Sequence, residues 1–187
     1  MKILKYPFIA LLVSFSFMSC SSDDDTPEVI NEEEVITTMN VTLTNGSQVI
    51  TLQSQDLDGD GPNDPVLTVS GNLAANTTYS GVIELLNETE SPAEDVTEEV
   101  ADENTDHQFF FITGGSAIAS TSYSDTDDDG KPLGIDFSLV TGSAGTASLT
   151  ITLIHQPDKD ASGVSDGDIT NAGGETDFTA TYAITVE

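Results

Sequence analysis

Two stretches of the chain place aspartates at a spacing that could bind a metal ion. In "DTDDDGKPLGID" (125–136), glycine stands sixth, and the first, third, fifth and twelfth positions are Asp125, Asp127, Asp129 and Asp136. The calcium loop of an EF-hand has oxygen ligands at these positions and glycine at the sixth, although its twelfth residue is a longer Glu. We expect calcium here in a structural role. The alternative is a solvated turn, since Asp and Gly also favour turns.

The second stretch, "DLDGDGPNDP" (56–65), repeats the start of this pattern. Asp56, Asp58 and Asp60 have the same spacing, but Leu67 stands where the twelfth ligand should be. The same two interpretations apply, structural calcium or a turn.

The two histidines, His107 and His155, each lie at the end of an expected strand and share a face with apolar residues. If they met at one end of a sandwich, they could bind Zn²⁺ or Cu²⁺ with a nearby carboxylate, for which Glu175, Asp106 and Asp168 are the candidates. The chain has no short-range H-x-H spacing, which favours the alternative that each histidine is a hydrogen-bonded residue at a strand end.

Nucleophilic catalysis has no support in the sequence. Cys20 is the single cysteine, and no Gly-x-Ser-x-Gly elbow is present. The Gly-containing turns lack the following helix and lysine of a phosphate loop. A carboxylate pair could hydrolyse a glycoside, but the chain has no Trp to serve as a sugar platform. We expect a protein that is not an enzyme and has no organic cofactor.

The charge of the chain excludes further classes of partner. The sequence has 33 Asp and Glu against 4 Lys and Arg, for a formal charge of −29. Binding of nucleic acid or nucleotides needs basic side chains to neutralise phosphates, so both are excluded. An acidic surface of this kind attracts divalent cations.

The N-terminus has the pattern of a signal peptide. Lys2 and Lys5 precede the apolar run 7–17, which is too short for a membrane-spanning helix. "FMSC" then resembles a bacterial lipobox, so we expect residues 1–19 to be cleaved and Cys20 to be lipidated. The alternative is a free or buried cysteine.

Residues 20–34 are polar and acidic and predict a disordered tether. The run "SSDDD" behind Cys20 resembles the surface-export signal of Bacteroidota lipoproteins, with a plain flexible tether as the alternative. We expect an outer-membrane lipoprotein whose acyl anchor sits in the bilayer, facing the cell surface rather than the periplasm.

The remaining residues, 35–187, read as one mainly β domain. Apolar and polar residues alternate in 35–44, 134–140, 147–155 and 177–186, while 78–86 and 107–112 are more continuously apolar, as in strands buried on both faces. Segment 91–103 predicts one short helical crossover, with a capping box formed by Ser91 and Glu94. Together these elements favour a two-sheet antiparallel β-sandwich of immunoglobulin-like type.

The segments "EEVITTMNVTLT", "DLDGDGPNDPVLTVSGNL", "LIHQPDK" and "NAGGETDF" resemble a family of small Bacteroidota lipoproteins, chiefly from flavobacteria. The likeness runs from about Glu33 to the C-terminus. Members carry the labels "type 1 periplasmic binding fold" or "GTP cyclohydrolase". This chain is too short for the first and lacks the Cys/His zinc centre of the second. The resemblance implies an envelope location and adds no mechanism.

Three functions follow as expectations. The first is a lipid-anchored, non-enzymatic module that binds a ligand or an envelope protein, with calcium-stabilised loops. The second is a Zn/Cu-handling lipoprotein beside an outer-membrane transporter, using His107 and His155. The third is an acidic structural or adhesive coat protein.

Overall fold

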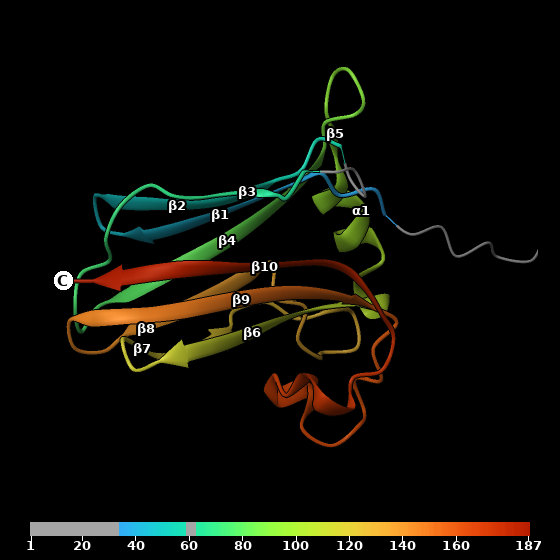
Figure 1. Ribbon diagram of the computed structural model, residues 1–187. Coiled ribbons are helices and arrows are strands. Elements are labelled where there is room, and N and C mark those ends of the chain that lie inside the picture. The colour runs from blue at the N-terminus through green and yellow to red at the C-terminus, as the bar shows by residue number, and fades with distance from the viewer. Residues whose placement is uncertain (1–33, 59–62) are drawn as a thin grey trace, which may run out of the picture. The chain divides into compact units, whose positions relative to one another are not determined.

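The computed structural model describes residues 34–58 and 63–187, and within them the strands form two antiparallel sheets (Figure 1). The larger sheet has the order β3-β2-β1-β4-β8-β7, and a short β5 also pairs with β4. Its strands are β1 (Thr38–Asn45), β2 (Gln48–Gln55), β3 (Val66–Val69), β4 (Thr78–Asn87), β5 (Glu94–Asp95), β7 (Ile118–Tyr123) and β8 (Asp136–Thr141). The smaller sheet has the order β10-β9-β6, from β6 (His107–Gly115), β9 (Gly145–His155) and β10 (Glu175–Val186).

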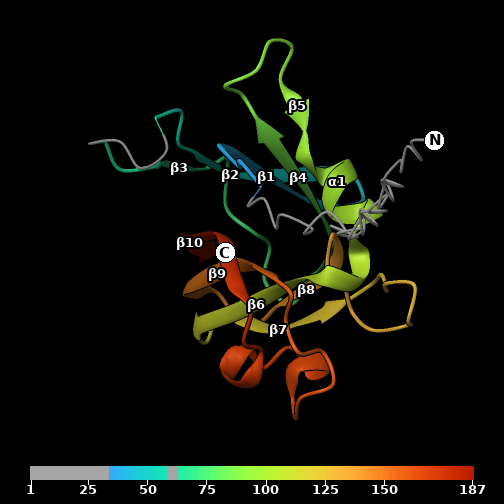
Figure 2. The same cartoon turned by 90° about the vertical axis from the view of Figure 1, so that its right-hand side faces the viewer.

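The two sheets pack face to face because their strands alternate between apolar and polar side chains. Figure 2 shows β1, β2 and β3 above β10, β9 and β6. Met39, Val41 and Leu43 of β1 belong to the same buried apolar cluster as Leu149 and other residues of the smaller sheet. The predicted mainly β, two-sheet antiparallel architecture is confirmed.

The strand β6 is buried on both faces at its start, as its sequence predicts. Phe109 faces the main core, while Phe110 packs with Ile154, Val164 and Ala172 in a second, smaller cluster. The loop 156–174, which carries the short 3₁₀ turns η2 (Val164–Asp166) and η3 (Ile169–Asn171), covers this outer face.

The prediction that 78–86 is buried on both faces is wrong. Along β4, Tyr79, Gly81, Ile83 and Leu85 are buried, and the residues between them are exposed or half-buried. The outer face of β4 meets solvent at Val82, because no loop of the described chain covers it as 156–174 covers β6.

The helix starts later than the sequence predicts. Helix α1 (Val96–Asp102) is capped by Asp95, whose carboxylate accepts a hydrogen bond from the Thr97 N–H at 3.0 Å. The predicted capping box at Ser91 is therefore wrong. The helix begins late because Glu94 and Asp95 are held in an extended conformation, where they pair with the end of β4 as strand β5. A 3₁₀ turn, η1 (Asn104–Asp106), follows and leads into β6.

Strands β2, β3 and β7 stand outside the predicted set. The edge strands β3 and β7 bury few side chains, so their sequences carry little alternation. Strand β2 does alternate, with Ile50, Leu52 and Ser54 buried, so its sequence pattern could have predicted it. In the described residues no helix is both long enough and apolar enough to cross a membrane.

Candidate metal centre

Strand register brings the two histidines together. His107 is the first residue of β6, His155 is the last of β9, and the two are directly paired across the antiparallel ladder. Their rings stack with centroids 4.6 Å apart and planes 19° from parallel. His107 has no exposed surface and His155 only 4%. The sequence analysis gave a meeting of the two rings only as the less favoured possibility, and in the structure they do meet, at one end of the sandwich.

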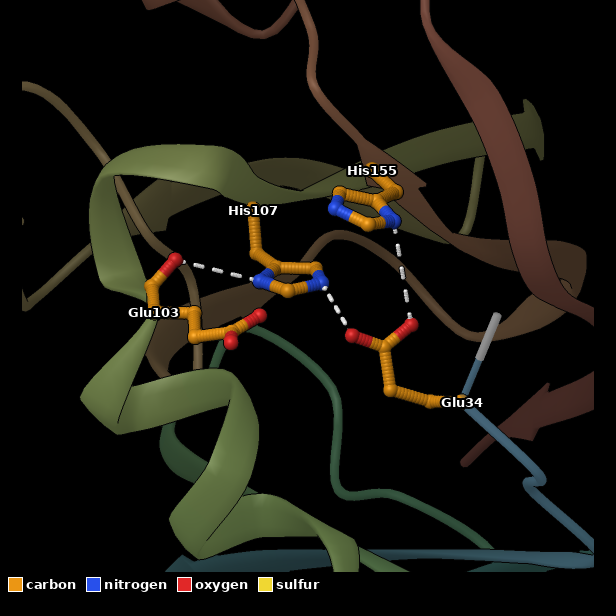
Figure 3. Close-up of side chains that lie close together, drawn as sticks. All are labelled: Glu34, Glu103, His107 and His155. Atoms are coloured by element: carbon orange, nitrogen blue, oxygen red, sulfur yellow. Dashed lines mark hydrogen bonds and ion pairs between the residues drawn. The ribbon is translucent and has the colours of Figure 1, made fainter. Parts of the chain in front are cut away.

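A carboxylate from the other side of the sandwich bridges the two rings. Glu34 lies just before β1, and its side chain is only 2% exposed. One of its oxygens, Oε1, lies 2.9 Å from His107 Nε2, and the other, Oε2, lies 3.9 Å from His155 Nδ1. Figure 3 shows this arrangement, with one carboxylate oxygen facing each ring.

A second buried carboxylate comes from a β-bulge in β10. The register between β10 and β9 shifts between Thr176 and Phe178, which leaves Asp177 as the extra residue. A bulge re-aims side chains, and here it directs Asp177 inward on a strand whose other odd-numbered residues face outward. Its Oδ2 lies 3.8 Å from His107 Nε2, and its side chain is 1% exposed.

The end of α1 sets the orientation of His107. The ring Nδ1 lies 3.1 Å from the backbone carbonyl oxygen of Glu103, the residue that ends α1. A carbonyl can only accept, so Nδ1 carries the proton. The opposite nitrogen, Nε2, then faces Glu34 either with its lone pair or as part of an imidazolium. Metal-binding histidines have this same outer contact, which fixes the tautomer.

Three polar atoms of this centre are buried without a hydrogen-bond partner in the part of the chain that the structure describes: Glu34 Oε2, His107 Nε2 and His155 Nδ1. Buried polar atoms without partners are uncommon in native proteins and require an explanation. All three converge on the space between the rings and the carboxylate. A bound cation would give each of them a partner.

The charge of the centre also favours a bound cation. Glu34 and Asp177 together carry a formal charge of −2 when ionised, and the side chains of both are buried beside the two imidazole rings. Two imidazolium ions could balance this charge, but stacked at 4.6 Å they would repel each other. One divalent cation balances the same charge without that repulsion.

Glu103 adds a carboxylate at the margin of the centre. Potential ligand atoms of Glu34, Glu103, His107 and His155 all lie within 4.8 Å of one another. Among the described residues, this is the group of His, Cys, Asp and Glu side chains that lie close enough together to hold a metal ion. Glu103 is exposed and lines an open acidic groove along α1. Burial raises the pKa of the nearby Glu99 carboxyl, and repulsion from Glu34 and Glu103 raises it further.

The carboxylates predicted from sequence lie elsewhere. Glu175 pairs with His155 in the ladder but is exposed and outside the group of ligand atoms. Asp106 is exposed, and its carbonyl accepts a hydrogen bond from the Gln156 N–H. Asp168 caps η3 through Thr170, and this hydrogen bond lowers its pKa. Glu34 was not among the predicted metal ligands, because the composition of residues 20–34 predicts a disordered tether.

The stretch 125–136 forms a loop held by its own hydrogen bonds. Asp125 accepts from the Gly134 N–H at 2.7 Å and the Asp136 N–H at 2.9 Å. Asp127 Oδ1 accepts from the N–H groups of Asp129 and Lys131. These contacts close the loop without a metal ion.

The other oxygen of Asp127, Oδ2, already has a cation as its partner. Lys159 Nζ lies 2.7 Å away, and both side chains are buried. Burial acts to raise the pKa of Asp127, but hydrogen bonds from Lys159 and from backbone N–H groups outweigh it and hold the pKa below its usual value. Within the described residues, the four aspartates of this loop do not form a group of metal-ligand atoms. The geometry favours the turn alternative, and calcium here stays a prediction.

The stretch 56–65 lies partly outside the described residues, and Asp60 with it. Asp56 accepts from the Asp58 N–H at 3.3 Å, and Asp58 accepts from the Asn63 side-chain amide at 2.6 Å. These are local turn contacts. Cys20, the expected lipidation site, also lies outside the described residues.

Comparisons with family models, with curated proteins and with solved structures found no match to this chain. The resemblance to the small lipoproteins of Bacteroidota therefore stays a prediction. The geometry of the centre is the remaining guide to function.

Proposed function

We propose that the protein binds one divalent transition-metal ion, Zn²⁺ or Cu²⁺, between His107, His155 and Glu34, as a lipid-anchored protein of the cell envelope. The observation that carries the proposal is the convergence on one point of three buried ligand atoms, His107 Nε2, His155 Nδ1 and Glu34 Oε2, that have no hydrogen bond within the described residues and meet there only as ion pairs between the rings and the Glu34 carboxylate. The role is binding rather than catalysis, and an outer-membrane transporter is the expected partner.

The donor set supports these metals over calcium. Calcium takes six to eight oxygen ligands, whereas imidazole nitrogens suit Zn²⁺ and Cu²⁺. His107 Nε2, His155 Nδ1 and the Glu34 carboxylate would hold the ion, with Asp177 close enough to His107 Nε2 to join them. When bound, the metal supplies positive charge to a buried acidic site.

The protein's own groups prepare the centre for this charge. The Glu103 carbonyl keeps the proton of His107 on Nδ1, so that Nε2 is left for the metal. Stacking against His155 restrains both rings. Burial excludes water that would otherwise compete for the ligand atoms.

Isothermal titration calorimetry of the mature domain, with Cys20→Ser, tests the proposal. We expect one Zn²⁺ or Cu²⁺ per chain in wild type and no such binding in the double variant His107→Ala/His155→Ala. A thermal melt shows whether that variant still folds. Glu34→Gln keeps the side-chain volume and should weaken binding by at least about 10–100-fold, the range seen even for outer-shell changes.

Glu175→Gln is the matched control, because Glu175 pairs with His155 but lies outside the centre. It should bind like wild type. Equal metal affinity in wild type, Glu34→Gln and a folded double variant would overturn the proposal.

A further inference from the structure

Strand β10 is the longest strand of the described chain, with 12 residues, and most of one of its edges is unpaired. In the ladder it pairs only with β9. On the other edge only its end has a partner among the described residues. There the Leu73 N–H donates to the Thr185 carbonyl oxygen, and the Glu187 N–H donates to the Leu73 carbonyl oxygen, both at 2.9 Å. The edge before residue 185 is therefore free.

The alternation of the strand identifies which backbone groups face this free edge. In an antiparallel ladder, every second residue directs both its N–H and its C=O to the same edge. Because the Thr185 carbonyl points to the free edge, the backbone groups of Thr179, Thr181 and Ala183 point there as well. These groups have no hydrogen-bond partner among the described residues, and the three side chains are exposed.

The free edge of β10 lacks the features that usually prevent an added strand. Native edge strands are protected by proline, by charged side chains, by bulges or by short length. The run 178–184 contains no proline and no charged residue, and the bulge at Asp177 lies before it. The other edge strands are protected. Strands β3 and β7 have only four and six residues, and the Phe109 N–H of β6 donates to the Leu133 carbonyl oxygen.

Space for an added strand lies beside the start of this edge. A groove of about 360 Å³ is lined by Phe178 and Thr179 of β10 and by Pro65, just before β3. Phe178 packs against the main core, whereas Thr179 is exposed. Since side chains of a strand alternate between the two faces, an added strand should direct apolar side chains to the face of Phe178 and polar ones to the face of Thr179.

Charge favours a basic partner over a second copy of this chain. Both ends of β10 carry an exposed acid, Glu175 and Glu187. The lysines of the described residues, Lys131 and Lys159, are in ion pairs away from this edge. Antiparallel pairing of β10 with a second β10 about Thr181 would place Glu175 opposite Glu187, and like charges placed opposite each other destabilise a ladder. Basic side chains would be attracted to the same positions.

We propose that the free edge of β10 binds an extended segment of a partner protein as an additional strand. The segment alternates apolar residues with Lys or Arg. Backbone hydrogen bonds to Thr179, Thr181 and Ala183 supply the register, as in other cases of strand addition. The edge forms without a metal ion, so this proposal is independent of the metal centre.

Fluorescence anisotropy with a labelled synthetic peptide tests the proposal on the full mature chain with Cys20→Ser, in the presence of a chelator. The peptide alternates valine and lysine over about nine residues, which spans Thr179 to Ala183 with two residues to spare at each end. We expect it to bind. The same peptide with Glu in place of Lys should not bind.

Two variants at one position separate backbone pairing from attraction between charges. Thr181→Pro removes the N–H that faces the free edge and leaves the donors to β9 in place, a substitution that edge strands tolerate. It should weaken binding of the lysine peptide by at least about tenfold, through the lost hydrogen bond and the bulk of the ring. Thr181→Val keeps the N–H and should bind like wild type. Thermal melts show whether both variants fold.

N-methylated peptides test the same contact without a change in the protein. In an added strand, one alternate set of peptide N–H groups faces β10 and the other set faces away. Methylation of one set should abolish binding, and methylation of the other set should leave it intact.

Three results would overturn the proposal. The first is no binding of the lysine peptide to the folded wild-type chain. The second is equal binding by the two methylated peptides, or by folded Thr181→Pro and Thr181→Val, since attraction between charges alone would then explain the affinity. The third is a dimer in sedimentation that Thr181→Pro abolishes, which would assign the edge to a second copy. Failure of metal binding would leave the proposal unaffected.

Discussion

Lys159 is the residue whose role was least visible in the sequence. Its ammonium is buried between Asp127 Oδ2, at 2.7 Å, and the backbone carbonyl of Asn104, at 2.8 Å. It thereby ties the loop 156–174 to the loop 125–136 and to the first residue of η1. A cation of the protein itself neutralises an aspartate that the sequence assigned to calcium.

Lys159→Met should destabilise the domain by about 3–5 kcal/mol, because it leaves the buried Asp127 carboxylate without its partner. Lys131→Met is the matched control. Lys131 also pairs with an aspartate at 2.7 Å, but Asp160 is 84% exposed, so the expected loss is about 0–1 kcal/mol. Urea unfolding in the presence of a chelator measures both. Equal losses in the two variants would contradict the assignment.

The same ion pair predicts a pH dependence. The pKa of Asp127 is lower in the folded chain than its usual value near 3.9. Its contribution to stability is thus present above that unfolded value and is lost as the pH falls through the lower folded pKa. We expect Lys159→Met to lose less stability than wild type below about pH 4. Unfolding free energies measured from pH 6 to pH 2 test this, and parallel curves for the two proteins would refute it.

At the scale of elements, pairing between strands decides where α1 begins. Because Asp95 rather than Ser91 caps the helix, Asp95→Ala should cost about 1 kcal/mol. Ser91→Ala, at the cap predicted from sequence, should change stability by less than about 0.5 kcal/mol. Chemical denaturation of the two variants compares the positions directly, and a larger loss for Ser91→Ala would restore the sequence prediction.

The metal centre joins elements of both sheets. Glu34 leads into β1 of the larger sheet, while His107, His155 and Asp177 belong to β6, β9 and β10 of the smaller one. A metal bound at this point would connect the sheets at one end of the sandwich. It would also bind the folded state alone, since the unfolded chain does not bring these residues together.

Zinc should therefore raise the melting midpoint of the domain. At a free zinc concentration of 100 times Kd, the expected stabilisation is about 2.7 kcal/mol, which for a domain of this size is a rise of roughly 5–10 °C. Calorimetric melts with zinc and then with chelator measure it. The rise should be absent in Glu34→Gln and present in Glu175→Gln. An equal rise in both would place the zinc elsewhere.

At the scale of the whole molecule, we expect the lipid on Cys20 to determine whether the protein is attached to the membrane. Cys20→Ser should abolish acylation and move the protein from the membrane fraction to the soluble fraction, because the lipid supplies the membrane affinity. Fractionation and labelling with a radioactive fatty acid test this. Retention of Cys20→Ser in the membrane fraction would count against the lipoprotein hypothesis.

Local patterns in the sequence determined the class of fold and the position of the histidines. Alternation along strands such as 147–155 and 177–186 identifies which side chains face inward, since successive residues of a strand point to opposite faces. The same parity placed His107 and His155 on the core side at strand ends. Composition alone determined the acidic charge.

Only the tertiary structure decided which acids meet the histidines. Glu34 approaches them from the other sheet, and a one-residue bulge turns Asp177 inward against the parity of β10. Lys159 likewise reaches Asp127 across a long separation in sequence. These contacts depend on strand register and on the packing of one sheet against the other, which no local spacing of residues encodes.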